Sequence, residues 1–414
     1  MGIVSKDSVN PCDRINIGFI GVGYRAEFAL NRFRYIKGAR IAAICDSDKA
    51  KRDDVASFLK TSGVNNVAVY ASDAELLNDD TIDLVYISTP WASHAAIAVE
   101  AMKQGKHVAL EVPAAMTIDE CWALVHTAEA TQKTCSILEN CCYDEFTLAM
   151  QNMIDDGLLG DIYHCEGAYI HRLCERMIGN NPNYKEAWMP QAYMQMNGNI
   201  YPTHGFGPLA MALGLNRGDR AVSINSISTK PRVYNAYVKE TYGEDVPFTL
   251  GDVSSSLITT ESGKTVELQF DIATPRPYSR KQLVSGTKGM YHKYPTEEIA
   301  LMPDYHQYLS VSQKEELLAR YRHPIIEHAS QLFKNIDNEK VQLKGVMDFA
   351  MDLRLVQCLQ AGVTPDLDVY DAAMWSSLVE LSATSAGMNG APVAIPDFTC
   401  GRWKEKREAF ASIK

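Results

Sequence analysis

The stretch INIGFIGVGYRA, residues 15–26, determines the fold that we expect for the first part of the chain. An apolar run leads into the pattern Gly-x-Gly-x-x-Ala, made by Gly21, Gly23 and Ala26, and the helix-like segment EFALNRFRYI follows. Gly21 permits a tight turn, Gly23 lets a pyrophosphate approach the backbone, and Ala26 allows the helix to pack closely on the strand. The pattern therefore predicts a dinucleotide-binding turn, with phosphate at the N-terminus of the helix.

The hydrophobic pattern predicts two kinds of sheet. Roughly the first 120 residues alternate short apolar runs with helical stretches, as in a doubly wound parallel sheet of the Rossmann type. From about residue 160, the segments DIYHCEGAYIHRL, AVSINSISTK and RKQLVSGTKGMYHKY show strand-like alternation between turn residues. We expect an α/β protein with an N-terminal Rossmann sheet and a C-terminal α+β domain that contains a large, mostly antiparallel open sheet.

The choice of dinucleotide depends on Asp46, which ends the strand-like run RIAAICD. A carboxylate there accepts hydrogen bonds from the adenosine ribose and repels a 2′-phosphate, which favours NAD over NADP. Lys49 is close in sequence and weakens this preference. The segment STPWASH, residues 88–94, also ends a predicted strand, so it lies at the carboxyl edge where such sheets bind ligands.

Two domains follow from these patterns. We expect residues 14–140 to form the NAD-binding Rossmann domain and residues 141–414 to form a domain for substrate binding and oligomerisation. The late helical segments VMDFAMDLRLVQCLQAG and DVYDAAMWSSLVELSATSAG come after the strands. We expect these C-terminal helices to pack back on the first domain.

Composition limits the partners and the compartment. The net charge is −11 and no basic stretch offsets it, which argues against nucleic acid. The sequence contains no run of 18 apolar residues, so we expect no membrane span, and the first residues show no apolar signal segment. Ten cysteines without a C-x-x-C pair predict buried thiols and no metal site. We expect a cytoplasmic protein, with a removed export signal as the open alternative.

Several motifs carry a resemblance to known families. The GxGxxA turn, STPWASH and Glu111-Val112-Pro113 resemble the glucose–fructose oxidoreductase/inositol dehydrogenase (Gfo/Idh/MocA) superfamily. Its members usually have Glu-Lys-Pro in place of Glu-Val-Pro, so Val112 stands where they have a lysine. The longer segments LENCCYDEF, CEGAYIH, NGNIYPTHGFGP and RPYSR resemble the NAD-dependent α-N-acetylgalactosaminidases of glycoside hydrolase family 109. This second resemblance extends from about residue 15 to about residue 404.

The resemblance implies a glycoside hydrolase that uses NAD+ without net oxidation. Transient oxidation at C3 of the sugar makes a ketone, which acidifies the C2 hydrogen enough for a side-chain base to remove it. Elimination across C1–C2, addition of water and re-reduction then complete the hydrolysis. His204 matches the base for the C3 hydroxyl, and Tyr169 matches the residue that handles the C2 proton. A phenol needs a nearby cation or strong donor for this role.

The same resemblance assigns the contacts. The substrate contacts that it implies are Glu139, Tyr201, Tyr278 and the position of Met189. In the family an arginine stands at this last position, so Met189 replaces a charged donor with an apolar thioether and implies a changed sugar contact. The cofactor contacts are Gly21, Gly23, Tyr24, Arg25, Asp46, Ser88, Thr89, Trp91, His94, Glu111 and Asn140.

Alternatives stay open at this point. His94 has a structural reading, as a residue at a helix N-terminus that bonds to backbone. His171 reads as a sheet residue that is able to reach the site, and Arg172 or Arg176 are candidates to supply the charge that Met189 lacks. The chain as a whole has two other readings, an NAD-dependent sugar or polyol dehydrogenase, against which Val112 argues, and a non-catalytic sensor of a sugar or cofactor. By resemblance we also expect a homo-oligomer, a dimer or a tetramer, that acts on a small-molecule glycoside.

Overall fold

The computed structural model describes residues 13–179, 181–334, 336, 345–408 and 410. The first residues, on which the expectation about an export signal depends, lie outside this part. The backbone divides into two compact units. One comprises Met1–Glu145, His323–Ala373 and Glu408–Lys414, and the other comprises Phe146–Arg322 and Met374–Arg407.

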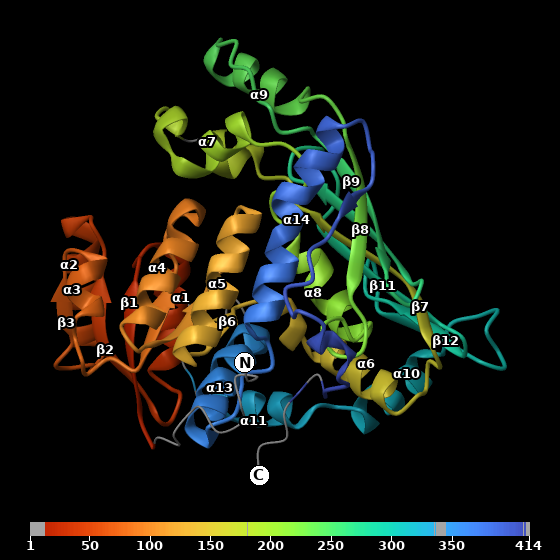
Figure 1. Ribbon diagram of the computed structural model, residues 1–414, viewed down its shortest axis with the longest axis horizontal. Helices are drawn as coiled ribbons and strands as arrows, with labels where there is room; N and C mark the ends of the chain where they lie inside the picture. Colours follow the sequence, from red (N-terminus) through yellow and green to blue (C-terminus); the bar gives the residue numbers. More distant parts are fainter. Residues whose placement is uncertain (1–12, 180, 335, 337–344, 409, 411–414) are drawn as a thin grey trace. The chain divides into compact units, whose positions relative to one another are not determined.

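The first unit contains the predicted Rossmann sheet. Its six strands are all parallel and lie in the order β3-β2-β1-β4-β5-β6, which is the order of dinucleotide-binding sheets (Figure 1). The strands are β1 (Ile15–Ile20), β2 (Ala39–Cys45), β3 (Ala68–Tyr70), β4 (Leu84–Ile87), β5 (His107–Leu110) and β6 (Cys135–Ile137). The central strands β1, β4 and β5 are almost wholly buried, as expected for a parallel sheet between two layers of helices.

Helices of the first unit begin and end at residues that the sequence marks. They are α1 (Tyr24–Phe33), α2 (Lys49–Thr61), α3 (Asp73–Leu77), α4 (His94–Lys103), α5 (Ile118–Thr131), α11 (Pro324–Phe333) and α13 (Gly345–Ala361). Thr117 caps α5, and the Glu120 side chain bonds back to the backbone of Thr117, which together form a capping box. The late helix α13 contacts α1, β1 and α11, so a segment from far along the chain joins this unit (Figure 1).

The second unit contains an eight-stranded sheet in the order β13-β12-β11-β7-β10-β9-β8-β14. Neighbouring strands are antiparallel except for β7 and β10, which confirms a mostly antiparallel sheet. Its strands are β7 (Ile162–Ile170), β8 (Ala221–Ser228), β9 (Ser254–Thr260), β10 (Thr265–Asp271), β11 (Ser279–Gly286), β12 (Gly289–His292), β13 (Glu298–Leu301) and β14 (Val393–Ala394). The short segment ESGKT, residues 261–265, forms the hairpin turn between β9 and β10.

The helices around this sheet include α8, which packs on β7, β10 and β11. The set is α6 (Glu145–Asp155), α7 (Trp188–Gln195), α8 (Thr203–Ala212), α9 (Val233–Tyr242), α10 (Val311–Arg320) and α14 (Val369–Gly387). The short helical turns of the second unit are η3 (Glu175–Gly179), η4 (Tyr184–Glu186) and η5 (Arg402–Lys404), and those of the first unit are η1 (Trp91–Ser93) and η2 (Asn140–Tyr143).

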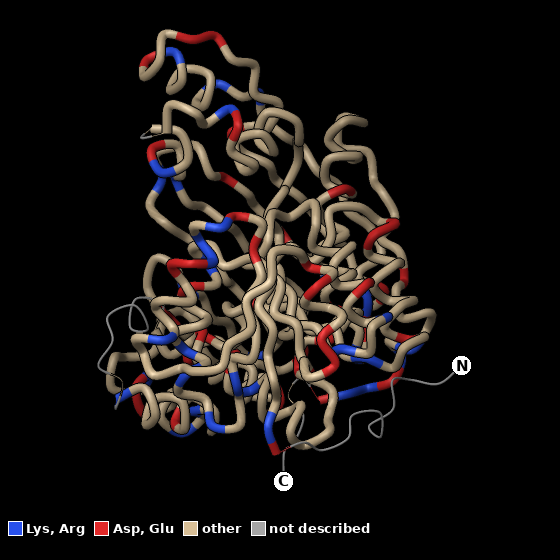
Figure 2. Tube along the Cα trace, turned by 90° about the vertical axis from the view of Figure 1, so that its left-hand side faces the viewer, with Lys and Arg blue, Asp and Glu red and all other residues tan. Residues whose placement is uncertain are grey.

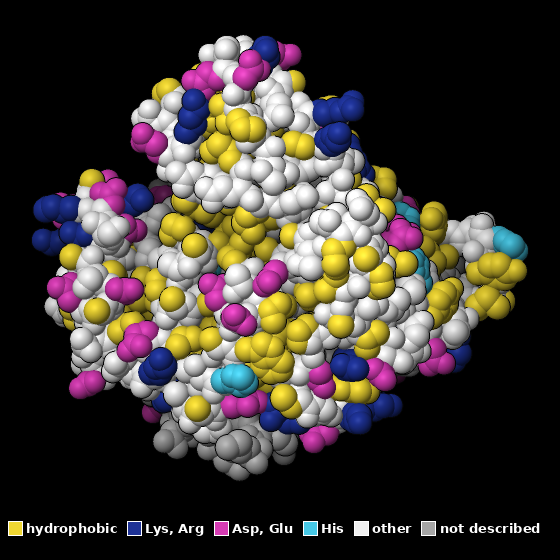
Figure 3. Space-filling model, turned by 45° about the horizontal axis from the view of Figure 1, so that its top comes forward, with side chains coloured by type: hydrophobic (Ala, Val, Ile, Leu, Met, Phe, Trp, Pro, Cys, Tyr) yellow, Lys and Arg dark blue, Asp and Glu magenta, His cyan; other side chains and the backbone are white. Residues whose placement is uncertain are grey.

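Charges of both signs alternate along the described backbone (Figure 2). On the face drawn in Figure 3, lysine and arginine side chains are mixed with aspartate and glutamate side chains. In the part of the chain that the structure describes, no helix combines the length and apolar character needed to cross a membrane. Eight of the described cysteines are buried free thiols, and Cys400 is exposed.

Candidate active site

The glycine-rich turn between β1 and α1 leaves open space at the N-terminus of the helix. Gly21 has a φ of +82°, and a Cβ there would lie 2.8 Å from the carbonyl oxygen of Ser88. A Cβ on Gly23 would meet no heavy atom within 4 Å, and no side chain among the described residues caps α1. The open first turn of α1 thus has the shape and the N–H groups that a pyrophosphate requires.

Asp46 is fixed beside this turn. Its Oδ2 accepts a hydrogen bond from the backbone N–H of Val22, at 2.9 Å, and its Oδ1 accepts one from Asp48. Lys49 pairs with Asp53 on the exposed face of α2, at 2.5 Å. Arg52 is the cation that contacts Asp46, because its guanidinium donates to the Asp46 carbonyl oxygen at 2.5 Å. The residues present therefore fit an adenosine ribose, with Arg52 as a neighbour that the sequence pattern did not single out.

The segment STPWASH lies at the carboxyl end of β4, as predicted. The Ser88 hydroxyl donates to the carbonyl of Gly21 at 2.8 Å, and Thr89 accepts from Ser93 at 2.7 Å. Trp91 is buried at the start of η1. These contacts tie the end of β4 to the glycine-rich turn.

His94 is bound to backbone on both sides of its ring. Nδ1 lies 2.8 Å from the carbonyl oxygen of Pro113, and Nε2 lies 2.8 Å from that of Thr89. Burial lowers the pKa of this imidazole, although the two carbonyl groups oppose that effect. This geometry agrees with the structural reading of His94, because a ribose hydroxyl would have to displace one of the two carbonyls. Its predicted contact with the cofactor stays a prediction.

The position of the usual lysine is occupied by Val112, which is buried. The preceding residue, Glu111, accepts two hydrogen bonds on the same oxygen. Oε1 accepts from Nε of Arg25 at 2.5 Å and from the hydroxyl of Tyr86 at 2.9 Å. Arg25 lies in the first turn of α1, so Glu111 is linked directly to the dinucleotide-binding turn.

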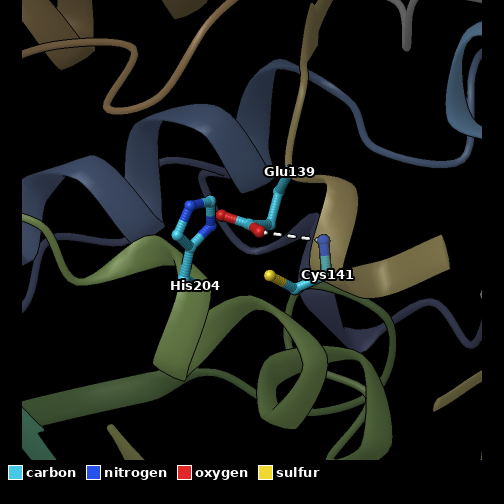
Figure 4. Close-up of side chains that lie close together, drawn as sticks. All are labelled: Glu139, Cys141 and His204. Atoms are coloured by element: carbon cyan, nitrogen blue, oxygen red, sulfur yellow. Dashed lines mark hydrogen bonds between the residues drawn. The ribbon is translucent and has the colours of Figure 1, made fainter. Parts of the chain in front are cut away.

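Two neighbouring residues that follow β6, Glu139 and Asn140, make polar contacts within the first unit. Glu139 is fully buried and caps η2, where one carboxylate oxygen accepts from the N–H of Cys141 at 3.1 Å (Figure 4). The adjacent Asn140 donates its side-chain N–H to Asp348 on α13 at 2.5 Å. Tyr24, a predicted cofactor contact, is 55% exposed at the start of α1.

In the second unit, β7 and α8 approach until their backbones touch. A Cβ on Gly205 would lie 2.8 Å from the backbone of Ala168, and a Cβ on Gly167 would clash with the carbonyl oxygen of Gly205. His204, on the first turn of α8, directly precedes Gly205, and Tyr169 follows Gly167 by two residues. The close contact therefore brings the two predicted catalytic side chains together.

The side chains around this contact form an aromatic cluster, which we define as Tyr169, His171, Tyr201, His204 and Tyr278. The Tyr169 ring lies 5.4 Å from His204 and 5.0 Å from Tyr201, measured between centroids. Its hydroxyl lies 3.0 Å from Nδ1 of His171, and Tyr278 packs edge-on against His171 at 5.2 Å. Four predicted site residues therefore lie together, with His171 as the fifth member.

Three other candidate residues, Met189, Arg172 and Arg176, are not members of the aromatic cluster. Met189 is half-buried on the first turn of α7. Arg172 pairs with Glu175 at 2.6 Å and donates to the carbonyl of Ala273, and Arg176 is exposed on η3. The role of Met189 and the replacement of its missing charge stay predictions.

Comparison with known proteins decides the family. Residues 143–405 match the family described as Glycosyl hydrolase 109, C-terminal domain, and residues 15–139 match the Oxidoreductase family with an NAD-binding Rossmann fold. The chain belongs to glycosyl hydrolase family 109. It is a glycosidase with an NAD-binding domain.

Relatives in glycosyl hydrolase family 109 match over almost the whole chain. Glycosyl hydrolase family 109 protein 2 of Phocaeicola vulgatus is 41% identical over 406 residues, which cover 95% of this chain and 96% of the relative. A protein of Bacteroides fragilis named alpha-N-acetylgalactosaminidase is 40% identical over 407 residues, which cover 95% and 94%.

Solved structures with lower identity share the fold. A levoglucosan dehydrogenase in complex with NADH and L-sorbose has a TM-score of 0.72 at 16% identity, over 93% of this chain and all of that one. An oxidoreductase domain protein from Kribbella flavida has a TM-score of 0.70 at 17% identity, with the same coverage. The two-part architecture of this family 109 member is therefore shared with oxidoreductases.

For His171 the sequence leaves two possibilities open, a residue of the sheet or one that reaches the site. The structure has its ring beside Tyr169, two positions earlier, a spacing that places both side chains on one face of an extended strand. One residue of this family 109 member escaped the sequence argument altogether. Asp348 lies in an apolar helical run, where a carboxylate is costly to bury unless it is paired. Its pairing with α1 could not be read from the sequence, because the approach of α13 to α1 is a tertiary contact.

Proposed function

We propose that this chain hydrolyses α-N-acetylgalactosaminides, or a closely related glycoside, by transient oxidation at C3 and elimination across C1–C2. The aromatic cluster carries this proposal, because it combines an imidazole and a phenol that is hydrogen-bonded to a second imidazole. When bound, NAD+ would supply an acceptor for the C3 hydride and, in its reduced form, the donor that reduces the ketone again.

The side chains of the cluster divide the proton transfers. His204 takes the proton of the C3 hydroxyl, since a neutral imidazole is a suitable base near neutral pH. Tyr169, as its phenolate, takes the proton from C2 and becomes a neutral phenol, and a hydrogen bond from Nδ1 of His171 stabilises the phenolate before this transfer. The same Tyr169 oxygen returns a proton to C2 after water has added at C1, so the base is regenerated.

The two parts of the chain have separate tasks in this proposal. Residues 14–140 bind NAD, and residues 141–414 provide most of the contacts to the glycoside, with α13 returning to the first part. Glu139, Tyr201 and Tyr278 contact the sugar, and Met189 makes an apolar contact where a charged donor is usual. Because this contact differs, we expect the preferred sugar to depart from the family pattern in its C2 substituent or its configuration.

The assembly and compartment are part of the proposal as well. Ile227 on β8 is 66% exposed and Leu257 on the neighbouring β9 is 43% exposed. Apolar side chains on an uncovered sheet favour a homo-oligomer through this face. The buried free thiols favour a reducing compartment such as the cytoplasm.

A panel of p-nitrophenyl glycosides tests the function. The protein is incubated with α- and β-linked substrates, with and without NAD+, while nitrophenol and NADH absorbance are followed together. We expect nitrophenol release that depends on NAD+ and no accumulation of NADH. Accumulation of NADH from a free sugar, without nitrophenol from any glycoside, would establish a dehydrogenase instead.

The variant Tyr169→Phe completes this test. It keeps the ring and removes the hydroxyl, so we expect unchanged NAD+ binding and a loss of activity of about 100-fold or more. Full activity of this variant would remove Tyr169 from the mechanism.

A further inference from the structure

Two helices of the first unit are joined by buried charges. On α1, Arg25 and Arg32 are seven residues apart, which is two helical turns, and on α13, Asp348 and Asp352 are four apart. Both pairs therefore lie on one face of their helix. Arg32 lies 2.6 Å from Asp352 and 3.3 Å from Asp348, and Arg25 lies 3.2 Å from Asp348.

The two aspartates differ in what else they contact. Asp348 uses both oxygens: Oδ1 accepts from the amide of Asn140 at 2.5 Å, and Oδ2 accepts from Arg25 and Arg32. Asp352 uses one oxygen, which accepts from Arg32, and its Oδ1 has no hydrogen-bond partner among the described residues. Both side chains are fully buried. Asp348 is thus bonded to two predicted cofactor contacts, Arg25 and Asn140. The described hydrogen bond of Asp352 is to Arg32, which is not a predicted cofactor contact.

Two partners of Asp348, Arg25 and Asn140, are among the residues predicted to contact the cofactor. Arg25 is on the first turn of α1 and also binds Glu111 at 2.5 Å. Asn140 begins η2, and its Oδ1 lies 3.5 Å from the thiol of Cys141, so the amide is restrained on both sides. The carboxylate of Asp348 determines that the amide N–H points toward α13 and that its oxygen points away.

We propose that Asp348 is a positioning residue for NAD, which orients the Asn140 amide and the Arg25 guanidinium through its two carboxylate oxygens. This inference rests on the proposed function, in which Arg25, Glu111 and Asn140 contact NAD. Asp348 touches neither the sugar nor the reacting atoms. It acts by removing the alternative orientations of two side chains before the cofactor arrives, which lowers the entropic cost of binding.

The test compares Asp348→Asn with Asp352→Asn in the full-length protein. Both replacements exchange a buried carboxylate for an amide of the same shape, on the same face of the same helix. NAD+ affinity is measured by titration calorimetry in the absence of sugar, after bound cofactor has been removed. We expect Asp348→Asn to raise the Kd for NAD+ by about tenfold or more, and Asp352→Asn to change it by less than about twofold.

A second variant separates positioning from folding. Asp348→Glu keeps a negative charge against both arginines but moves the carboxylate relative to Asn140. We expect its thermal midpoint to lie closer to wild type than that of Asp348→Asn, while its affinity for NAD+ is still reduced. A double-mutant cycle with Asn140→Ala should then show strong non-additivity in NAD+ affinity, because both changes disrupt one contact.

Three outcomes would overturn the inference. They are equal NAD+ affinity of wild type and Asp348→Asn, equal weakening by the two asparagine variants, and additive effects of Asp348→Asn and Asn140→Ala. Because sugar is absent from this measurement, it is independent of the glycosidase assay. A wild-type protein that binds NAD+ but hydrolyses no glycoside would refute the proposed function and leave the role of Asp348 to be decided by the affinities.

Discussion

The phenolic oxygen of Tyr169 lies 3.0 Å from Nδ1 of His171, two residues further along the chain. A tyrosine that removes a carbon-bound proton near neutral pH needs a partner that stabilises its deprotonated form. The imidazole of His171 is such a partner, because in its protonated form Nδ1 donates a hydrogen bond to the phenolate. In the proposed mechanism, this contact is the physical means by which Tyr169 is activated.

Replacement of His171 tests this relationship. His171→Phe keeps the edge-on ring contact with Tyr278 and removes the nitrogen atoms, so we expect kcat to fall about 10- to 100-fold. His164→Phe is the matched control, because His164 is on β7, the strand that contains Tyr169, and bonds to Thr265. Steady-state hydrolysis rates check both variants. A His171→Phe enzyme as active as the His164→Phe enzyme would contradict the role of His171.

The contact of Gly205 with β7 gives a second prediction. Gly205→Ala forces a Cβ to within 2.8 Å of the Ala168 backbone, which should destabilise the protein by about 1–3 kcal/mol and displace His204. A displacement of this kind lowers kcat by up to about 100-fold. Gly387→Ala is the control in the same unit, since its Cβ would meet nothing within 4 Å. Denaturant unfolding and kcat are measured for both, and a Gly205→Ala protein with wild-type kcat would show that the close contact is not needed for His204.

The cofactor preference depends on Asp46. Asp46→Ala removes the charge that disfavours a 2′-phosphate and leaves Arg52 in place, so we expect the ratio of NADP+ to NAD+ affinity to rise about tenfold or more. Asp48→Ala is the control, because Asp48 caps α2 and its loss should cost about 1 kcal/mol of stability without changing the ratio. Titration of each protein with both dinucleotides gives the answer. An unchanged ratio in Asp46→Ala would place the ribose elsewhere.

Asp352 predicts a pH dependence of stability. Burial raises the pKa of its carboxyl group to about 6, and Arg32 opposes this shift only in part. The folded state therefore binds a proton more tightly than the unfolded state, whose aspartate has a pKa of about 3.9. The stability from this proton is fully present below about pH 4 and is lost as the pH rises through about 6, with a limit of about 3 kcal/mol.

Comparison with Asp352→Asn isolates this contribution. Other groups near Asp352, including Asp348, Arg25 and Tyr86, are common to both proteins. The free energy of unfolding of wild type minus that of Asp352→Asn should decrease steadily between about pH 4 and pH 7, as measured by urea unfolding. A difference that stays constant over this range would show that Asp352 is ionised throughout.

The sequence predicted those parts of the site that depend on local pattern. Gly21, Gly23 and Asp46 could be assigned because a strand, a tight turn and a helix fix their geometry over a short segment. The strand pattern likewise predicted the sheet that contains Tyr169. These features depend on periodicity and turn chemistry, which neighbouring residues determine.

The contacts between distant segments could not be predicted in the same way. The Asp348 network requires that α13 packs on α1, and the sequence shows only that a buried aspartate needs a partner. The aromatic cluster requires that Gly205 and Gly167 meet, although a glycine by itself is equally consistent with a turn or a bulge. For His94 the sequence left two readings open, a cofactor contact and a residue that bonds to backbone. The hydrogen bonds of its ring to the carbonyl oxygens of Thr89 and Pro113 agree with the second reading, and they also depend on contacts between segments.

Hydrolysis in D2O tests the central claim most directly. The released sugar is analysed by mass spectrometry and NMR for deuterium at C2, while NADH absorbance is followed in the same reaction. We predict that C2 of every released sugar carries deuterium from the solvent and that NADH does not accumulate. Efficient hydrolysis with the original hydrogen retained at C2 would contradict elimination through a C3 ketone and would require an ordinary displacement at C1.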